Sequence, residues 1–134
     1  MSAGERFFDT NVVLYLLSAD ARKAGIAERE LGNGGVVSVQ VLNEFASVAV
    51  RKFKMPMAEV REALAAVRAA CTVVPLTEAA HEKGIELAGR NKLPVFAAMI
   101  IASALLAGCQ TLLSEDMHDG QIFERRLKIH NPFG

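Results

Sequence analysis

Residues 6–17 read RFFDTNVVLYLL and place an acid between a short strand and an apolar helix. The aromatic pair Phe7–Phe8 is typical of a strand, and the apolar run from Val12 to Leu17 predicts a helix. Asp9 stands directly at the end of the strand. A strand that passes at once into a helix is the first part of a strand–helix–strand unit, so this stretch predicts an α/β fold.

The same alternation continues along the chain. The glycine-rich residues 32–35 are predicted to form a turn, Thr77 to cap a helix and Gly108 to end one. Further strands are predicted at 36–39, 72–76, 111–114 and 127–129, and further helices at 21–31, 41–53, 56–70, 78–90 and 94–107. Strands separated by helices pair in parallel through right-handed crossovers. The sequence therefore predicts a three-layer α/β/α sandwich with a mainly parallel sheet of about five strands, in a single domain spanning residues 1–134.

The composition is that of a globular protein without net charge. Hydrophobic residues make up 51% and charged residues 22%, and 15 basic residues balance 15 acidic ones. This balance argues against a polybasic nucleic-acid binder, although it allows a local basic patch. Cys71 and Cys109 have neither zinc-ligand spacing nor the pattern of a disulfide framework, so they are predicted to be buried and reduced.

Two features of the sequence predict a cytoplasmic protein without a membrane segment. Residues 1–6 lack the pattern of a secretory signal. The uncharged stretch 93–109 is near the lower length limit of a membrane span, but it contains Pro94 and Ser103 and lacks an aromatic or basic belt. We expect it to form a helix buried within the domain, or partly in a dimer interface.

Acidic side chains follow three of the predicted strands. Asp9 follows the first, Glu44 lies one turn into the helix after the second, and Asp116 and Asp119 follow the fourth. Ligands of such folds bind at the carboxyl ends of parallel strands, so these acids are expected at one edge of the sheet. A hard divalent cation would relieve their mutual repulsion. Oxygen ligands suit Mg²⁺ or Mn²⁺ better than Zn²⁺, and such a metal promotes phosphodiester hydrolysis.

Glu44 is the most informative of these acids because it lies on the apolar stripe of its helix. Val41, Phe45 and Val48 form that stripe, and Glu44 is three residues from the first and four from the last. An inward-facing carboxylate is costly unless it is paired, hydrogen-bonded or bound to a metal. The position of Glu44 therefore favours a functional carboxylate over a solvated one.

Each of the other polar residues also has a purely structural explanation. Asp9 could be a helix N-cap, and Asp116 and Asp119 could be turn or cap residues. Ser114 could bond a ligand carboxylate or cap a turn. Of the three histidines only His118 lies near these acids, and surface or supporting roles are predicted for all three. Clustered at predicted strand ends, however, the acids favour a metal site.

Four motifs along the chain resemble those of the PIN-domain nucleases, and in particular the VapC-type ribonuclease toxins. Residues 7–12 (FFDTNV) resemble the opening motif and residues 43–45 (NEF) the second. Residues 112–121 (LLSEDMHDGQ) resemble the late acidic motif, and residues 131–133 (NPF) the usual close. The motifs occur in the family's order and cover essentially the whole chain.

The resemblance implies a metal-dependent endoribonuclease that acts as the toxin of a toxin–antitoxin pair. Asp9, Glu44 and Asp116 would be its catalytic acids and, with Asp119, would hold Mg²⁺ or Mn²⁺. Asn11 would support these ligands, as would Ser114. Toxins of this kind are typically cytosolic homodimers that a cognate antitoxin holds inactive.

One position departs from the family pattern. The family carries an aspartate near the start of the helix before the fourth strand, where this chain has Ala97 in the segment Phe96-Ala97-Ala98-Met99-Ile100-Ile101. Loss in this lineage and deliberate replacement would both explain the alanine, and we favour replacement because Asp→Ala is a natural choice for making an inert toxin. Either way, the missing carboxylate predicts a folded chain with weakened or absent activity.

A basic run near the end of the third predicted helix is a candidate RNA contact. Arg51, Lys52 and Lys54 flank the aromatic Phe53, a combination that suits phosphate and base binding. The alternative is a solvated helix end, where cations complement the helix dipole.

Three other classes of protein share parts of this pattern. A PIN-like module that binds RNA or a protein without cleavage is favoured by Ala97. A haloacid-dehalogenase-like phosphatase would carry a second Asp where this chain has Asn11. A receiver domain would carry its acid after the third strand, where this chain has residues 75–77 (PLT).

Overall fold

A computed structural model describes residues 5–134 and shows an α/β fold built on a six-stranded sheet. The strand order is β3-β2-β1-β4-β6-β5, and all neighbours are parallel except β5 and β6. The strands are β1 (Arg6–Phe8), β2 (Gly35–Ser38), β3 (Cys71–Val74), β4 (Thr111–Leu113), β5 (Ile122–Phe123) and β6 (Leu127–His130). The predicted α/β class and mainly parallel sheet are therefore confirmed.

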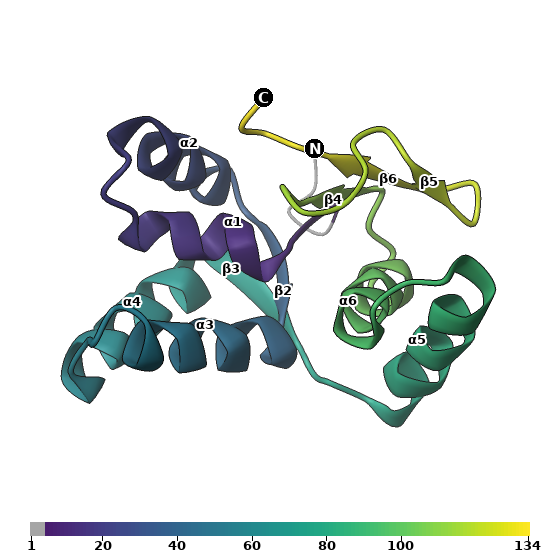
Figure 1. Ribbon diagram of the computed structural model, residues 1–134, viewed down its shortest axis with the longest axis horizontal. Helices are drawn as coiled ribbons and strands as arrows, with labels where there is room; N and C mark the ends of the chain where they lie inside the picture. The colour runs from purple at the N-terminus through teal and green to yellow at the C-terminus, as the bar shows by residue number, and fades with distance from the viewer. Residues whose placement is uncertain (1–4) are drawn as a thin grey trace.

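Helices cover both faces of the sheet. The helices are α1 (Thr10–Leu14), the 3-10 turn η2 (Tyr15–Leu17), α2 (Ala21–Gly32), α3 (Val39–Arg51), α4 (Met57–Ala70), α5 (Glu78–Asn91) and α6 (Val95–Leu106). Figure 1 shows α1 to α4 on one side of the sheet and α5 with α6 on the other. This arrangement is the predicted three-layer sandwich.

Local signals in the sequence account for several helix ends. The side chains of Asp20, Ser38 and Thr77 each accept a backbone hydrogen bond and cap the helices that follow them. Gly108, just beyond α6, has φ +75°, a conformation that suits glycine after a helix. The predicted roles of Thr77 and Gly108 are thus confirmed.

The uncharged helix α6 is buried along most of its length, as predicted. Residues 98–105 are all buried, and α6 packs against α5 and against β2. Within residues 5–134, no helix combines the length and the apolar character that a membrane crossing requires. Both cysteines are buried, also as predicted, and burial raises the pKa of each thiol to about 11.

The structure corrects several predicted boundaries. Gly35 belongs to β2 instead of the preceding turn, where it lies against the buried ring of Phe8. The helices α1 and α3 begin two residues earlier than predicted, because Asp9 and Ser38 act as their N-caps. The sheet has six strands and not about five, because the two-residue strand β5 pairs antiparallel with β6. A strand this short has no periodicity by which it could be recognised.

Candidate active site

Asp9 lies at the carboxyl end of β1 and is almost completely buried, with 7% of its surface exposed. Its Oδ1 accepts a hydrogen bond from the backbone N–H of Thr10 at 2.7 Å, so it does cap α1. Its Oδ2 accepts bonds from the hydroxyl of Ser114 at 2.8 Å and from Nδ2 of Asn11 at 3.1 Å. The N-cap role thus uses one carboxylate oxygen and leaves the other facing the end of β4.

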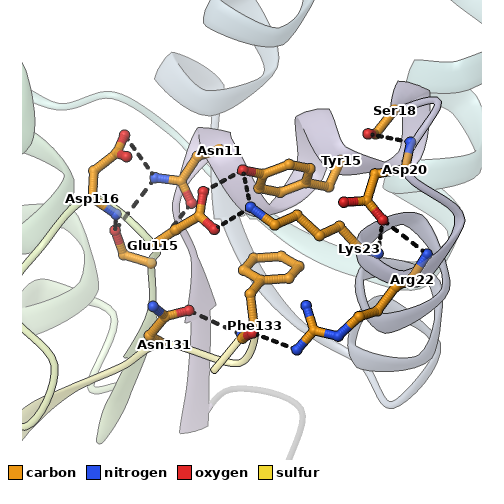
Figure 2. Close-up of polar contacts among 11 residues, drawn as sticks. Asn11, Tyr15, Ser18, Asp20, Arg22, Lys23, Glu115, Asp116, Asn131 and Phe133 are labelled. Carbon is orange, nitrogen blue, oxygen red and sulfur yellow. Dashed lines mark hydrogen bonds and ion pairs between the residues drawn. The ribbon is translucent and has the colours of Figure 1, made fainter.

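The parallel pairing of β1 and β4 brings the late acidic segment beside Asp9. Phe8 pairs with Leu113, so Asp9 and Ser114 leave the sheet side by side. The Ser114 hydroxyl also accepts from the backbone N–H of Asp116 at 3.2 Å. Asn11 donates from Nδ2 to Asp116 Oδ2 at 3.1 Å, as Figure 2 shows. Asn11 therefore bridges the carboxylates of Asp9 and Asp116.

Glu44 reaches the same edge of the sheet from α3. This helix follows β2, the neighbour of β1, and Ser38 fixes its start. The Glu44 Oε1 accepts a hydrogen bond from the Thr10 hydroxyl at 2.6 Å. Sequence reasoning did not single out Thr10, because a threonine in the first turn of a helix carries no signal of a partner 34 residues away.

These acids line one cavity of about 690 Å³. Its walls come from α1, α3, the start of α6 and the segment after β4. The cavity is lined by six of the predicted site residues: Asp9, Asn11, Glu44, Arg51, Ala97 and Asp116. His118 and Gln121 line it as well. The structure thus brings the three predicted catalytic acids onto one cavity with Ala97, the position where the resemblance led us to expect a fourth acid.

Four other predicted site residues do not line this cavity. The exposed Asp119 accepts a hydrogen bond from the backbone N–H of Asn131 at 2.9 Å, which is the cap-like alternative considered for it. Lys52 and Lys54 lie at the exposed end of α3 and beyond it. Ser114 is fully buried behind Asp9 and contacts the site only through its hydrogen bonds.

The sequence model of the PIN domain family matches residues 6–120. This chain belongs to the PIN domain family. No curated protein sequence matches the chain.

Solved structures with the same fold cover most of this PIN domain. A toxin–antitoxin complex from Klebsiella pneumoniae is 21% identical with a TM-score of 0.71, covering 95% of this chain and 97% of that one. VapC20 of Mycobacterium tuberculosis, a toxin that cleaves the sarcin–ricin loop, is 22% identical with a TM-score of 0.64, covering 80% and 86%. FitAB bound to a DNA fragment is 15% identical with a TM-score of 0.73, covering 96% of both chains. At these identities the likeness concerns the fold.

The surroundings of Asp9 in this PIN domain disfavour the ionised form of its carboxyl group. Burial raises the pKa of its carboxyl above the ordinary value, while hydrogen bonds from Ser114 and Thr10 lower it and the negative charges of Asp116 and Glu44 raise it further. The net direction is upward. A group that needs such support to stay ionised is characteristic of a functional site.

The raised pKa of Asp9 predicts a pH dependence of stability in chelator. The folded chain binds the proton of Asp9 more tightly than the unfolded chain does, so this contribution is present at low pH and lost as pH rises through the raised pKa. The Asp9→Asn variant cannot titrate there. We expect the parent to lose free energy of unfolding relative to Asp9→Asn as pH increases, measured by urea denaturation at each pH. A difference between the two chains that stays constant across pH would contradict this expectation.

The donor set at the cavity suits a hard cation only in part. Asp9, Asp116 and Glu44 offer carboxylate oxygens, the ligands that Mg²⁺ and Mn²⁺ prefer. Within residues 5–134, however, no three Asp, Glu, His or Cys side chains come close enough together to form a metal cluster. Mg²⁺ is held in proteins by one or two carboxylates and several waters, so Asp9 and Asp116 fit such a role.

Proposed function

We propose that this PIN domain is a metal-dependent endoribonuclease toxin whose activity is weakened by Ala97. The observation that carries the proposal is the meeting of Asp9, Glu44 and Asp116 with Ala97 on one cavity at the carboxyl edge of the sheet. Asp9 caps α1, but burial among other carboxylates penalises its charge, a cost that the N-cap role alone does not require. A cation held there would offset the repulsion among these carboxylates.

The residues of the cavity divide into distinct roles in this proposal. Asp9 and Asp116 would hold Mg²⁺ or Mn²⁺, with Asn11 fixing their spacing by its bonds to both. Such an ion supplies an activated water and stabilises negative charge on a phosphodiester. Glu44, which accepts a hydrogen bond from Thr10, would orient the water or accept its proton. Arg51, which lines the cavity, would bind a phosphate of RNA.

Ala97 accounts for the expected weakness of the site. It is the third residue of α6, in the first turn of that helix, and it lines the cavity without any polar group. A carboxylate at this position would add an oxygen ligand to the cavity that the carboxylates of Asp9 and Glu44 already line. Its absence reduces both the negative charge that attracts a cation and the number of groups that orient water.

Partners are proposed from the structural relatives. VapC20 cleaves an RNA loop, which supports RNA as the substrate class. The Klebsiella pneumoniae structure is a toxin–antitoxin complex, which supports a cognate antitoxin as the protein partner. We further propose a homodimer that acts in the cytoplasm.

A second candidate function is that of a PIN module that binds RNA or a protein without cleaving RNA. Ala97 is the observation that favours it, since a site kept for binding alone needs no complete set of acids. The two readings differ in whether restoring the acid produces cleavage.

The deciding experiment is cleavage of a mixed RNA pool by the Ala97→Asp chain with Mg²⁺, with Mn²⁺ and with a chelator. Cleavage that requires a metal and disappears in Ala97→Asp/Asp9→Asn supports the nuclease. RNA that is bound but stays intact under all conditions would replace this proposal with the binding module.

A further inference from the structure

Glu115 stands between two residues of the candidate site, but its side chain points away from the cavity. Its carboxylate accepts hydrogen bonds from the hydroxyl of Tyr15 and from Nζ of Lys23, the latter at 2.8 Å. Lys23 also donates to the Tyr15 hydroxyl at 3.0 Å. Figure 2 shows these three side chains converging beside Asn11. We call Tyr15, Lys23 and Glu115 the loop clamp.

The main chain at Glu115 is attached to α1 as well. Its backbone N–H donates to Asn11 Oδ1 at 3.1 Å, while Nδ2 of the same Asn11 bonds Asp9 and Asp116. Asn11 and Tyr15 are four residues apart and therefore lie on one side of the helical segment. Asn11 and Tyr15 thus attach the residues after β4 to the helical segment 10–17 at two points one turn apart. Asn11, the first of these points, also bonds the Asp116 side chain.

The ring of Phe133 packs against the loop clamp and covers part of it. The rings of Tyr15 and Phe133 lie 4.6 Å apart between centroids, and Nζ of Lys23 lies 4.7 Å from the Tyr15 centroid. The Lys23 and Glu115 side chains are 28% and 25% exposed. A partly shielded ion pair with added hydrogen-bond and cation–π contacts holds its geometry better than an isolated surface pair.

We propose that the loop clamp positions Asp116 against Asp9, and that Lys23 and Glu115 are positioning residues for the metal ion. The segment from Ser114 to Met117 is neither helix nor strand. Within it, the Ser114 hydroxyl accepts hydrogen bonds from the backbone N–H groups of Asp116 and Met117, and the loop clamp adds a contact from outside the segment. The clamp ties it to Tyr15 of η2 and to Lys23 of α2. The inference rests on the proposed function in taking Asp116 as a metal ligand.

The test compares clamp variants with a matched ion pair elsewhere. Lys83 pairs with Glu124, and their side chains are 25% and 30% exposed, close to the values of the clamp pair. This control pair joins α5 to the turn after β5 and does not line the cavity. In the Ala97→Asp chain, Mn²⁺ affinity is measured by electron paramagnetic resonance for Lys23→Met, Glu115→Gln and Lys83→Met. Amide hydrogen exchange at Glu115 and Asp116 is measured in metal-free protein.

We expect Lys23→Met and Glu115→Gln to weaken Mn²⁺ binding about tenfold, the effect typical of groups that orient metal ligands. Both should also speed amide exchange at Glu115 and Asp116, and Lys23→Arg should restore binding. Lys83→Met should change neither quantity, because neither Lys83 nor Glu124 lines the cavity.

Unchanged Mn²⁺ affinity in the clamp variants, or an equal loss in Lys83→Met, would overturn the inference. If the Ala97→Asp chain binds no Mn²⁺ at all, the proposed function fails instead. The role toward the metal ion then fails with it, and amide exchange decides only whether the clamp positions Asp116: faster exchange in the clamp variants supports that part, and unchanged exchange refutes it.

Discussion

The Ala97→Asp chain is expected to cleave RNA at least about 100-fold faster than the chain with alanine, the lower range for a positioned acid or base. The new carboxylate would enter the cavity that Asp9, Glu44 and Asp116 already line. It would add a metal or water contact from α6, a helix that now contributes only apolar groups and backbone there. Initial rates on one cleaved RNA, in Mg²⁺ and in chelator, measure the ratio.

The substitution is not expected to disturb the fold. Position 97 lies in the first turn of α6, where a negative charge is stabilised by the helix dipole by about 0.3–1 kcal/mol. Pro94 provides no side-chain cap to α6. The new carboxylate can therefore also accept a hydrogen bond from one of the free backbone N–H groups at the start of this helix. Ala97→Asn is the matched control, with nearly the same size and no charge. A rate in Ala97→Asn equal to that in Ala97→Asp would show that the carboxylate is not what the site lacks.

Topology explains why the central acids could be predicted from sequence. Once strands and helices alternate, the residue after each strand lies at one edge of the sheet whatever the details of packing. Asp9 and Asp116 follow strands that are direct neighbours, and Glu44 follows the next strand along. The strand-end rule therefore brought these three acids to one cavity without any knowledge of their side-chain contacts.

Contacts that depend on turns and distant segments could not be predicted. Asp119 is only three residues from Asp116, yet the chain turns at Gly120, with φ +87°, and Asp119 bonds Asn131 instead of facing the cavity. Lys23 and Glu115 are 92 residues apart, and no spacing in the sequence relates them. Three of the four candidate ligands thus followed from topology, and Asn11 and Ser114 from the resemblance, whereas the contacts of Thr10, Lys23 and Glu115 required the structure.

Gly35 was likewise assigned to a turn, and its true position predicts a large loss of stability in Gly35→Ala. A Cβ at this position would lie 2.4 Å from the ring of Phe8 and 2.9 Å from the backbone oxygen of Arg6. Phe8 is fully buried, so its ring has little room to move. We expect the free energy of unfolding to fall by about 2–3 kcal/mol, the upper range for overpacking a core. Urea denaturation in chelator measures this change.

Gly25 provides the matched control for this prediction. A Cβ at Gly25 meets no atom within 4 Å, and Gly25 lies inside α2. The same Gly→Ala change there should stabilise the chain by about 0.5–1 kcal/mol, because alanine loses less backbone entropy in a helix. If the change in the free energy of unfolding has opposite signs at Gly35 and Gly25, the steric effect of the new methyl group is distinguished from its effect on chain entropy. If Gly35→Ala proved as stable as the parent, Phe8 could move, and Asp9, the next residue, would not be rigidly placed by the sheet.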